Sequence, residues 1–106
     1  MFPYKRSYNP EACEYIDNLN KESGWNLQHA MNGGEVELYG YFVDGYDKDL
    51  NIIFEYDEPN HNRPKRKEKD IIRQNNLVEN INPKLFLRYN KQWDRLYDSK
   101  IDKNIV

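Results

Sequence analysis

Acidic side chains near the middle of this 106-residue chain are spaced in a way that points to chemistry with a cation. Asp44 lies in an expected strand, and Glu55 and Asp57 stand two residues apart at the end of the next one. If residues 48–51 form a loop between these strands, Asp44 falls opposite Glu55, with Cβ atoms about 5 Å apart. Asp57 shares the face of Glu55, because strand side chains alternate with a period of two. We therefore expect three carboxylates on one patch of a sheet, unless the register slips by one residue.

Opposed carboxylates are unfavourable in a sheet unless something compensates their charge. They can lie at a solvated edge, pair with Lys or Arg, or surround a cation. Oxygen ligands of this kind suit Mg²⁺ or Mn²⁺, and Asp44, Glu55 and Asp57 are the expected metal ligands. A cation held there would polarise a phosphoryl oxygen and lower the pKa of a bound water. The competing interpretation is that these are solvated charges at a strand end.

A histidine and a basic run follow the acidic residues directly. His61, four residues after Asp57, has the chemistry of a general base or proton shuttle, or is an ordinary loop histidine. The basic run can hold DNA phosphates, or it can be the solvated start of a helix. Its members are Arg63, Lys65, Arg66, Lys67 and Lys69.

Composition limits the other possibilities. The formal net charge is −2, so bulk charge does not indicate a nucleic-acid binder. The single cysteine, Cys13, excludes an internal disulfide and a cysteine-based zinc site.

No apolar run approaches a membrane span, so we expect an intracellular protein without a membrane partner. One domain over residues 1–106 is expected, with a thin aromatic core that makes a homodimer feasible.

Hydrophobic periodicity predicts a layered arrangement of helices and strands. Asn9-Pro10 starts a helix that ends near Ser23-Gly24. Asn32-Gly33-Gly34 predicts a hairpin turn. The expected elements are an arm over residues 1–8, strands over 25–31, 35–38, 41–46 and from 52, a helix from Pro64 to about Asn80, a strand over 85–89, and a terminal helix and tail over 93–106.

These elements predict an α/β (α+β layered) fold with a mixed sheet of about four strands flanked by helices. The strand before Pro64 and the strand at 85–89 are joined by a helix, which is the crossover connection of a parallel pair.

The order VDGY … IIFEYDEPNH … EKDIIRQNNL … LFLRY resembles the very-short-patch-repair-type endonucleases, within the PD-(D/E)XK nuclease superfamily. Relatives in that group include nuclease domains of some phage homing endonucleases, and QHAMNGGE (28–35) also resembles small phage and viral proteins of this type. The resemblance covers roughly residues 7–90. The positions that carry it are Val43-Asp44, Glu55-Tyr56-Asp57, His61, Asp70 to Arg73, and Arg88.

The resemblance implies a restriction-endonuclease-like fold and Mg²⁺-dependent hydrolysis of DNA. Asp44 would be the central metal ligand, and His61 would act in proton transfer. Asp70 and Arg73 would organise the site from the helix. The early helix of the superfamily often supplies a Glu, a place that Glu14 or Glu11 would fill.

The chain also departs from the superfamily pattern. The usual Lys two residues after the Glu is Asp57 here. The short-patch-repair branch likewise lacks that Lys and uses His. Glu35, beside the Gly-Gly turn, is either a further ligand or a hairpin flank. The alternative function is a catalytically inactive nuclease-fold module that binds nucleic acid or a partner protein.

Overall fold

The computed structural model describes residues 9–59 and 64–105, with the side chains of residues 64–66 left undescribed. The expected arm over residues 1–8 therefore lies outside the described residues. Helix α1 (Pro10–Ser23) begins and ends where the sequence predicts. Asn9 Oδ1 accepts hydrogen bonds from the backbone N–H groups of Glu11 and Ala12. Gly24 ends the helix in the left-handed region, at φ 79°.

A five-stranded mixed sheet forms the centre of the molecule, in the order β3-β4-β5-β6-β7. The expected crossover is confirmed, because β4 and β5 are parallel and α2 (Pro64–Ile81) connects them. The other neighbouring pairs are antiparallel. The strands are β3 (Gly45–Asp47), β4 (Ile52–Asp57), β5 (Leu85–Asn90), β6 (Arg95–Asp98) and β7 (Lys103–Asn104).

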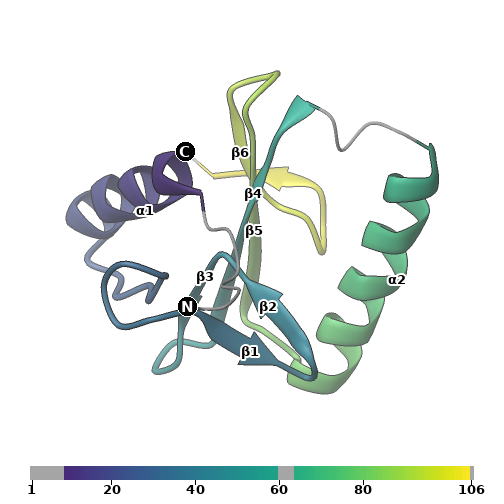
Figure 1. Ribbon diagram of the computed structural model, residues 1–106, viewed down its shortest axis with the longest axis horizontal. Helices are drawn as coiled ribbons and strands as arrows, with labels where there is room; N and C mark the ends of the chain where they lie inside the picture. Colours follow the sequence, from purple (N-terminus) through teal and green to yellow (C-terminus); the bar gives the residue numbers. More distant parts are fainter. Residues whose placement is uncertain (1–8, 60–63, 106) are drawn as a thin grey trace, which may run out of the picture.

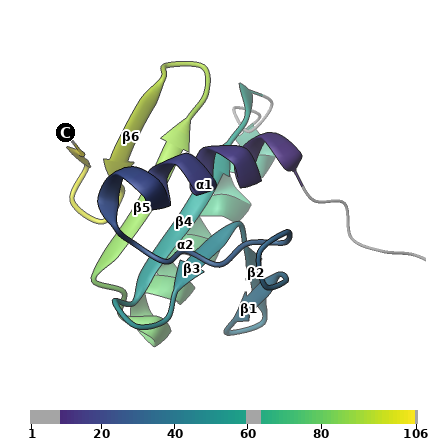
Figure 2. The ribbon, with the colours of Figure 1, turned by 90° about the vertical axis from the view of Figure 1, so that its left-hand side faces the viewer.

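The two helices cover opposite faces of this sheet, as Figures 1 and 2 show. Three alternate residues of β4 pack toward α1, in a core that includes Ile16: they are Ile52, Phe54 and Tyr56. Ile53 packs on the other face with Leu77 of α2 and Phe86 of β5. Glu55 and Asp57 continue the Ile53 face, since side chains alternate along a strand. The acidic residues therefore lie on the side that α2 covers.

The predicted hairpin register is confirmed where the strands pair. Asp47 lies opposite Ile52, Tyr46 opposite Ile53, and Gly45 opposite Phe54. One further step along this register brings Asp44 to Glu55. The predicted single strand over 41–46 is nevertheless wrong, because the chain bends at Asp44.

The first half of the interrupted strand belongs to a separate two-stranded sheet. Here β1 (Val36–Leu38) pairs with β2 (Tyr41–Val43) through the turn Tyr39-Gly40. Both turn residues have positive φ (50° and 82°), as a two-residue hairpin turn of the primed kind requires. Gly40 therefore forms the turn between β1 and β2, outside both strands.

The predicted strand over 25–31 is also wrong. Its only strand-like contact among the described residues is a bridge between Gln28 and Tyr46. The chain turns at residues 30–33, and Gly34 N–H donates to the His29 carbonyl at 3.0 Å. Buried His29 also bonds Asp17 of α1, with Nε2 2.7 Å from Oδ1. The segment thus docks on α1 rather than pairing with residues 35–38.

The predicted terminal helix is wrong as well, because this part of the chain forms β6 and β7. Leu96 and Tyr97 point to opposite faces of the sheet, as neighbours in a strand do, and only Leu96 packs in the core on the α1 side. Asn90 Oδ1 accepts the Trp93 N–H at 3.1 Å and stabilises the turn from β5 into β6. The sheet consequently has five strands rather than about four. None of the described helices is both long and apolar enough to cross a membrane.

Candidate functional site

Asp44 and Glu55 are linked by two hydrogen bonds that run between side chain and backbone. Glu55 Oε1 accepts the Asp44 N–H at 3.1 Å, and Asp44 Oδ2 accepts the N–H of Tyr56 at 2.8 Å. Each carboxylate therefore accepts a hydrogen bond from a backbone N–H group of the opposite segment, at the point where β3 and β4 stop pairing. Asp44 is solvent-exposed, whereas Glu55 is only 4% exposed.

Glu55 is a buried acid of the cleft whose pKa is strongly raised. Arg73 of α2 approaches it, with Nη2 2.7 Å from Oε2. Burial, followed by the negative charge of Asp44, raises the pKa of Glu55 to about 8, against the opposite influence of Arg73 and Arg88. Added positive charge in the cleft would favour the ionised carboxylate. A buried acid beside a second acid is a typical feature of functional sites.

Asp57 lies on the same face and is paired with Arg88 of β5. Arg88 Nη1 is 2.8 Å from Asp57 Oδ1, and Arg88 Nε donates to Gln74 Oε1 of α2 at 2.8 Å. The negative charges of Asp57 and Glu55 raise the pKa of Arg88, despite its burial. These contacts tie the carboxyl ends of β4 and β5 to α2.

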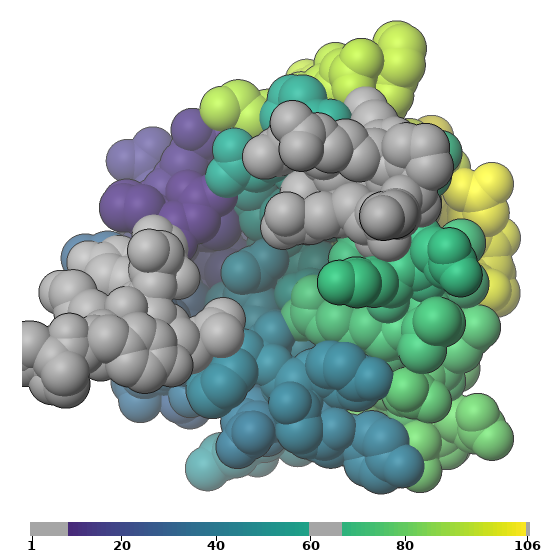
Figure 3. All heavy atoms as spheres, turned by 45° about the vertical axis from the view of Figure 1, so that its right-hand side comes forward, coloured from purple at the N-terminus to yellow at the C-terminus, as the bar shows by residue number. Residues whose placement is uncertain are grey.

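The carboxylates line an open cleft of about 550 Å³ between α1, the β1–β2 hairpin and α2. Figure 3 shows the hollow between these elements. It lies near the carboxyl ends of the parallel strands, the usual place for ligands in open α/β sheets. Its charged lining residues are Glu35, Asp44, Glu55, Asp57, Glu58, Asp70, Arg73 and Arg88.

The structure thus brings together most of the described residues that the sequence singled out. Asp44, Glu55, Asp57, Asp70 and Arg73 share the cleft. Glu35 also lines it, so its position is compatible with more than a hairpin flank.

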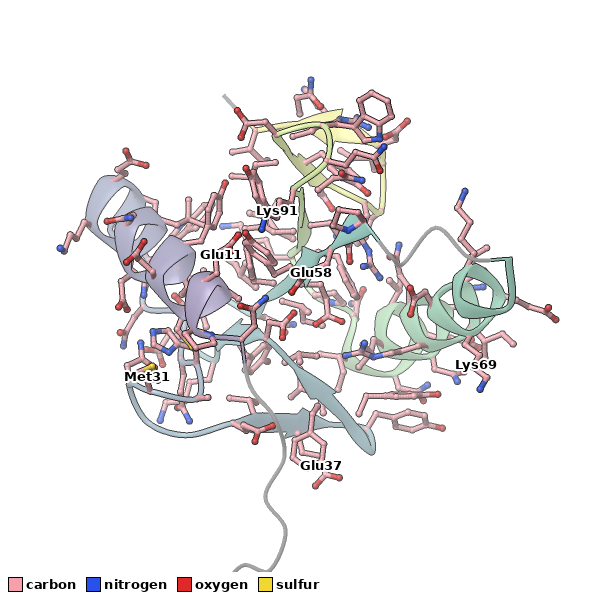
Figure 4. The ribbon with its side chains drawn as sticks, turned by 45° about the horizontal axis from the view of Figure 1, so that its top comes forward. Glu11, Met31, Glu37, Glu58, Lys69 and Lys91 are labelled. Carbon is pink, nitrogen blue, oxygen red and sulfur yellow. The ribbon has the colours of Figure 1, made fainter. Side chains whose placement is uncertain are left out.

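Some expected residues lie elsewhere. Glu14 is exposed on α1 and does not line the cleft. Lys67 lines a smaller neighbouring cleft of about 230 Å³. Lys69 is exposed and points away from the sheet (Figure 4). His61 and Arg63 lie outside the described residues, as do the side chains of Lys65 and Arg66.

Glu11, the second expected acid of the early helix, holds α1 against the sheet at the rim of the cleft. Tyr56 donates its hydroxyl to Glu11, and Lys91 Nζ lies 2.9 Å from Glu11 Oε2. The bonds from Tyr56 and Lys91 lower the pKa of Glu11. Asn9 donates to Glu58 Oε1 at 2.7 Å, close to this pair. Figure 4 shows Glu11, Lys91 and Glu58 together at the end of β4.

Sequence reasoning missed Gln74 and Glu58, and it reached Arg88 only through the resemblance. Arg88 lies beside Glu55 because the parallel register pairs Glu55 with Arg88. The alternation of Leu85–Asn90 could have shown that Phe86 and Arg88 lie on one face of the strand. It could not have shown that Arg88 is the neighbour of Glu55, because no short turn determines the register between the two parallel strands.

The donor set fits Mg²⁺ or Mn²⁺ in kind, because hard carboxylate oxygens line one open cleft. In the described part of the chain, however, no three acidic, histidine or cysteine residues come close enough to hold a cation as they stand. Glu55 Oε2 and Asp57 Oδ1 are instead paired with arginines. A cation bound at Glu55 Oε2 would compete with Arg73 for this oxygen.

Comparison of the chain with protein-family profiles, with curated proteins and with solved structures finds no match.

Proposed function

We propose that the protein is a divalent-metal-dependent endonuclease that hydrolyses phosphodiester bonds of DNA. The observation that carries the proposal is the pairing of Asp44 with buried Glu55 at the mouth of a cleft that Asp57 also lines. Several carboxylates this close together destabilise the fold unless positive charge lies beside them. The two arginines supply part of that charge.

In this proposal Asp44, Glu55 and Asp57 hold Mg²⁺ or Mn²⁺. The cation, when bound, supplies positive charge beside the phosphate and acidifies water next to it. Arg73, displaced from Glu55, remains at the cleft wall, where its guanidinium can bind a phosphate oxygen. Asp70 and Arg88 orient these groups, and His61 acts in proton transfer, as the sequence resemblance implies.

The direct test is cleavage of supercoiled plasmid DNA with Mg²⁺ or Mn²⁺. We expect metal-dependent nicking by the wild type and a loss of about 100-fold or more for Asp44→Asn, because an amide is a poor substitute for a carboxylate ligand. Asp49→Asn is the matched control, since Asp49 is exposed in the adjacent turn. Metal-independent activity, or equal activity of Asp44→Asn and wild type, would contradict the proposal.

A second function, a non-catalytic module that binds nucleic acid or a partner protein, is supported by the two carboxylate–arginine pairs. They place positive charge beside Glu55 and Asp57 without any cation. Calorimetric titration with millimolar Mg²⁺ and Mn²⁺ distinguishes the two functions. Saturable binding that Asp44→Asn weakens supports the nuclease, whereas an absence of binding supports the module.

A further inference from the structure

A row of polar side chains continues from the acidic cleft across the sheet. Glu55 lies beside Arg88 in the parallel register, and Arg88 lies opposite Tyr97 of β6. Two residues further along each strand, on the same face, Asp57 lies beside Asn90. The α2 face of the sheet is therefore polar over three strands near the carboxyl ends of β4 and β5, well beyond the three carboxylates of the proposed metal site.

Apart from Glu55, the residues of this row line the second cleft, of about 230 Å³, which opens between α2 and strands β4 to β6. The two clefts share the walls Asp57, Glu58, Asp70 and Arg88. A ligand with a phosphate in the first cleft can thus extend directly into the second. Its remaining lining residues are Pro59, Lys67, Ile71, Gln74, Asn90, Gln92 and Tyr97.

The chemistry of this lining differs from that of the first cleft. Gln74, Asn90 and Gln92 carry neutral amides, which donate and accept hydrogen bonds at once. Ile71 and Pro59 add apolar surface. Such a lining matches a nucleobase. The amides can bond the donors and acceptors on the edges of the base, and the apolar side chains can contact its flat faces.

Several of these groups are held in place by contacts already present. Gln74 is fixed by Arg88 at 2.8 Å, and Asn90 accepts the Trp93 N–H at 3.1 Å. Tyr97 lies opposite Arg88 across the β5–β6 pair and adds a hydroxyl, which can donate or accept a hydrogen bond. A preorganised polar lining reduces the entropy lost when a ligand binds.

We propose that the second cleft binds one unpaired nucleobase of a DNA strand whose neighbouring phosphate lies in the acidic cleft. This inference rests on the proposed function and adds a substrate class to it. The cleft volume of about 230 Å³, below the roughly 300 Å³ of pockets for drug-sized ligands, suits a single base. The substrate is then single-stranded DNA, or a duplex with an unpaired nucleotide beside the cut.

The experiment measures binding rather than cleavage, with ¹⁵N-labelled full-length Asp44→Asn protein and no metal. The probes are a thymidine trinucleotide, the same trinucleotide with an abasic middle position, and a fully paired DNA hairpin. We expect the trinucleotide to shift the side-chain amide signals of Gln74, Asn90 and Gln92 saturably. The abasic probe and the paired hairpin should leave these signals in place.

A matched pair of substitutions locates the site. Ile71 and Ile72 are neighbours on α2 and similarly exposed, at 59% and 53%, but only Ile71 lines the cleft. We expect Ile71→Glu to weaken trinucleotide binding about tenfold or more and Ile72→Glu to leave it near the parent value. Equal effects of the two substitutions, equal binding of the abasic probe, or no saturable binding would each overturn the inference.

The outcome is separable from that of the nuclease proposal. If the wild type never cuts DNA but the protein binds the trinucleotide in a base-dependent way, the nucleobase proposal is supported and the nuclease proposal is contradicted. If the wild type cuts plasmid DNA in a metal-dependent way but shows no base-dependent binding, the nuclease proposal is supported and the nucleobase proposal is contradicted.

Discussion

Arg73 of α2 forms an ion pair with Glu55 of β4, with Nη2 2.7 Å from Oε2, and the same nitrogen donates to the Phe42 carbonyl of β2. One guanidinium thereby joins the helix, the central sheet and the small hairpin. The Glu55 side chain is 5% exposed and the Arg73 side chain 26% exposed. The contact places positive charge beside a buried acid, and both residues line the candidate site.

Removing this guanidinium should destabilise the fold through Glu55. We expect Arg73→Ala to lower the free energy of unfolding by about 1–3 kcal/mol, because it leaves a buried acceptor without its charged donor. In a Glu55→Gln background the same substitution should cost less. Urea unfolding of the four proteins measures the difference, with Lys69→Ala as the control on the exposed side of α2. Equal losses in both backgrounds would show that the ion pair contributes nothing.

The raised pKa of Glu55 makes stability depend on pH. Because the folded-state pKa is about 8 and the ordinary value is 4.5, the folded protein binds the extra proton between these values. Its contribution is therefore fully present below about pH 4.5 and is lost as pH rises through about 8. Relative to Glu55→Gln, the wild type should be less stable at about pH 8.5 than at about pH 5.5, by at least about 1 kcal/mol. Urea unfolding at the two pH values tests this, and parallel pH profiles would refute it.

The two described lysines of the basic run should differ in their effect on DNA. Lys67 lines the second cleft, whereas Lys69 points away from the sheet (Figure 4). If DNA crosses the clefts, Lys67→Ala should weaken binding and reduce the salt slope by about one, and Lys69→Ala should change both less. Fluorescence anisotropy at several salt concentrations measures both quantities. A larger effect of Lys69→Ala would place the DNA elsewhere.

The position of Glu14 predicts a smaller role in cleavage than that of Asp57. Glu14 is exposed on α1 and does not line the cleft, whereas Asp57 does. We expect Asp57→Asn to lower metal-dependent cleavage at least about tenfold and Glu14→Gln to lower it less. Initial rates of plasmid nicking provide the comparison. An equal loss for Glu14→Gln would support the role that the sequence resemblance implies for the early helix.

Gly45 in β3 should not tolerate a side chain. A Cβ there would lie 3.0 Å from Ile16 Cδ1 and 3.3 Å from Phe54 Cβ. We expect Gly45→Ala to destabilise the protein by about 1–3 kcal/mol, because α1 packs directly on this strand. Glu37→Ala, on the exposed face of β1, should stay within about 0.5 kcal/mol. Thermal unfolding measures both, and an unchanged melting temperature for Gly45→Ala would contradict the close packing.

Local signals in the sequence were sufficient where the physical cause is itself local. Asn9-Pro10 and Gly24 set the ends of α1 through hydrogen bonds within a few residues. The four-residue loop fixed the pairing of Asp47 with Ile52, and with it the approach of Asp44 to Glu55. Candidate acids on these elements could therefore be named from spacing alone.

Segments with weak or ambiguous periodicity could not be assigned in this way. Residues 95–98 fit a short helix and a short strand equally well, and pairing with β5 decided for the strand. The Asn32-Gly33-Gly34 signal does mark a turn, but His29 and its bond to Asp17 direct the flanking chain onto α1. In both cases contacts between distant segments outweighed local preference.

The sequence by itself determined α1, α2, the parallel β4–β5 pair and the grouping of Asp44, Glu55 and Asp57, because each follows from hydrophobic periodicity, residue spacing or a short turn. Only the tertiary structure decided that Arg73 and Arg88 meet those carboxylates and that amides line a second cleft beside them. The reason is that a long crossover joins β4 to β5, so the register between them, and the position of α2 over them, come from packing rather than from any local rule.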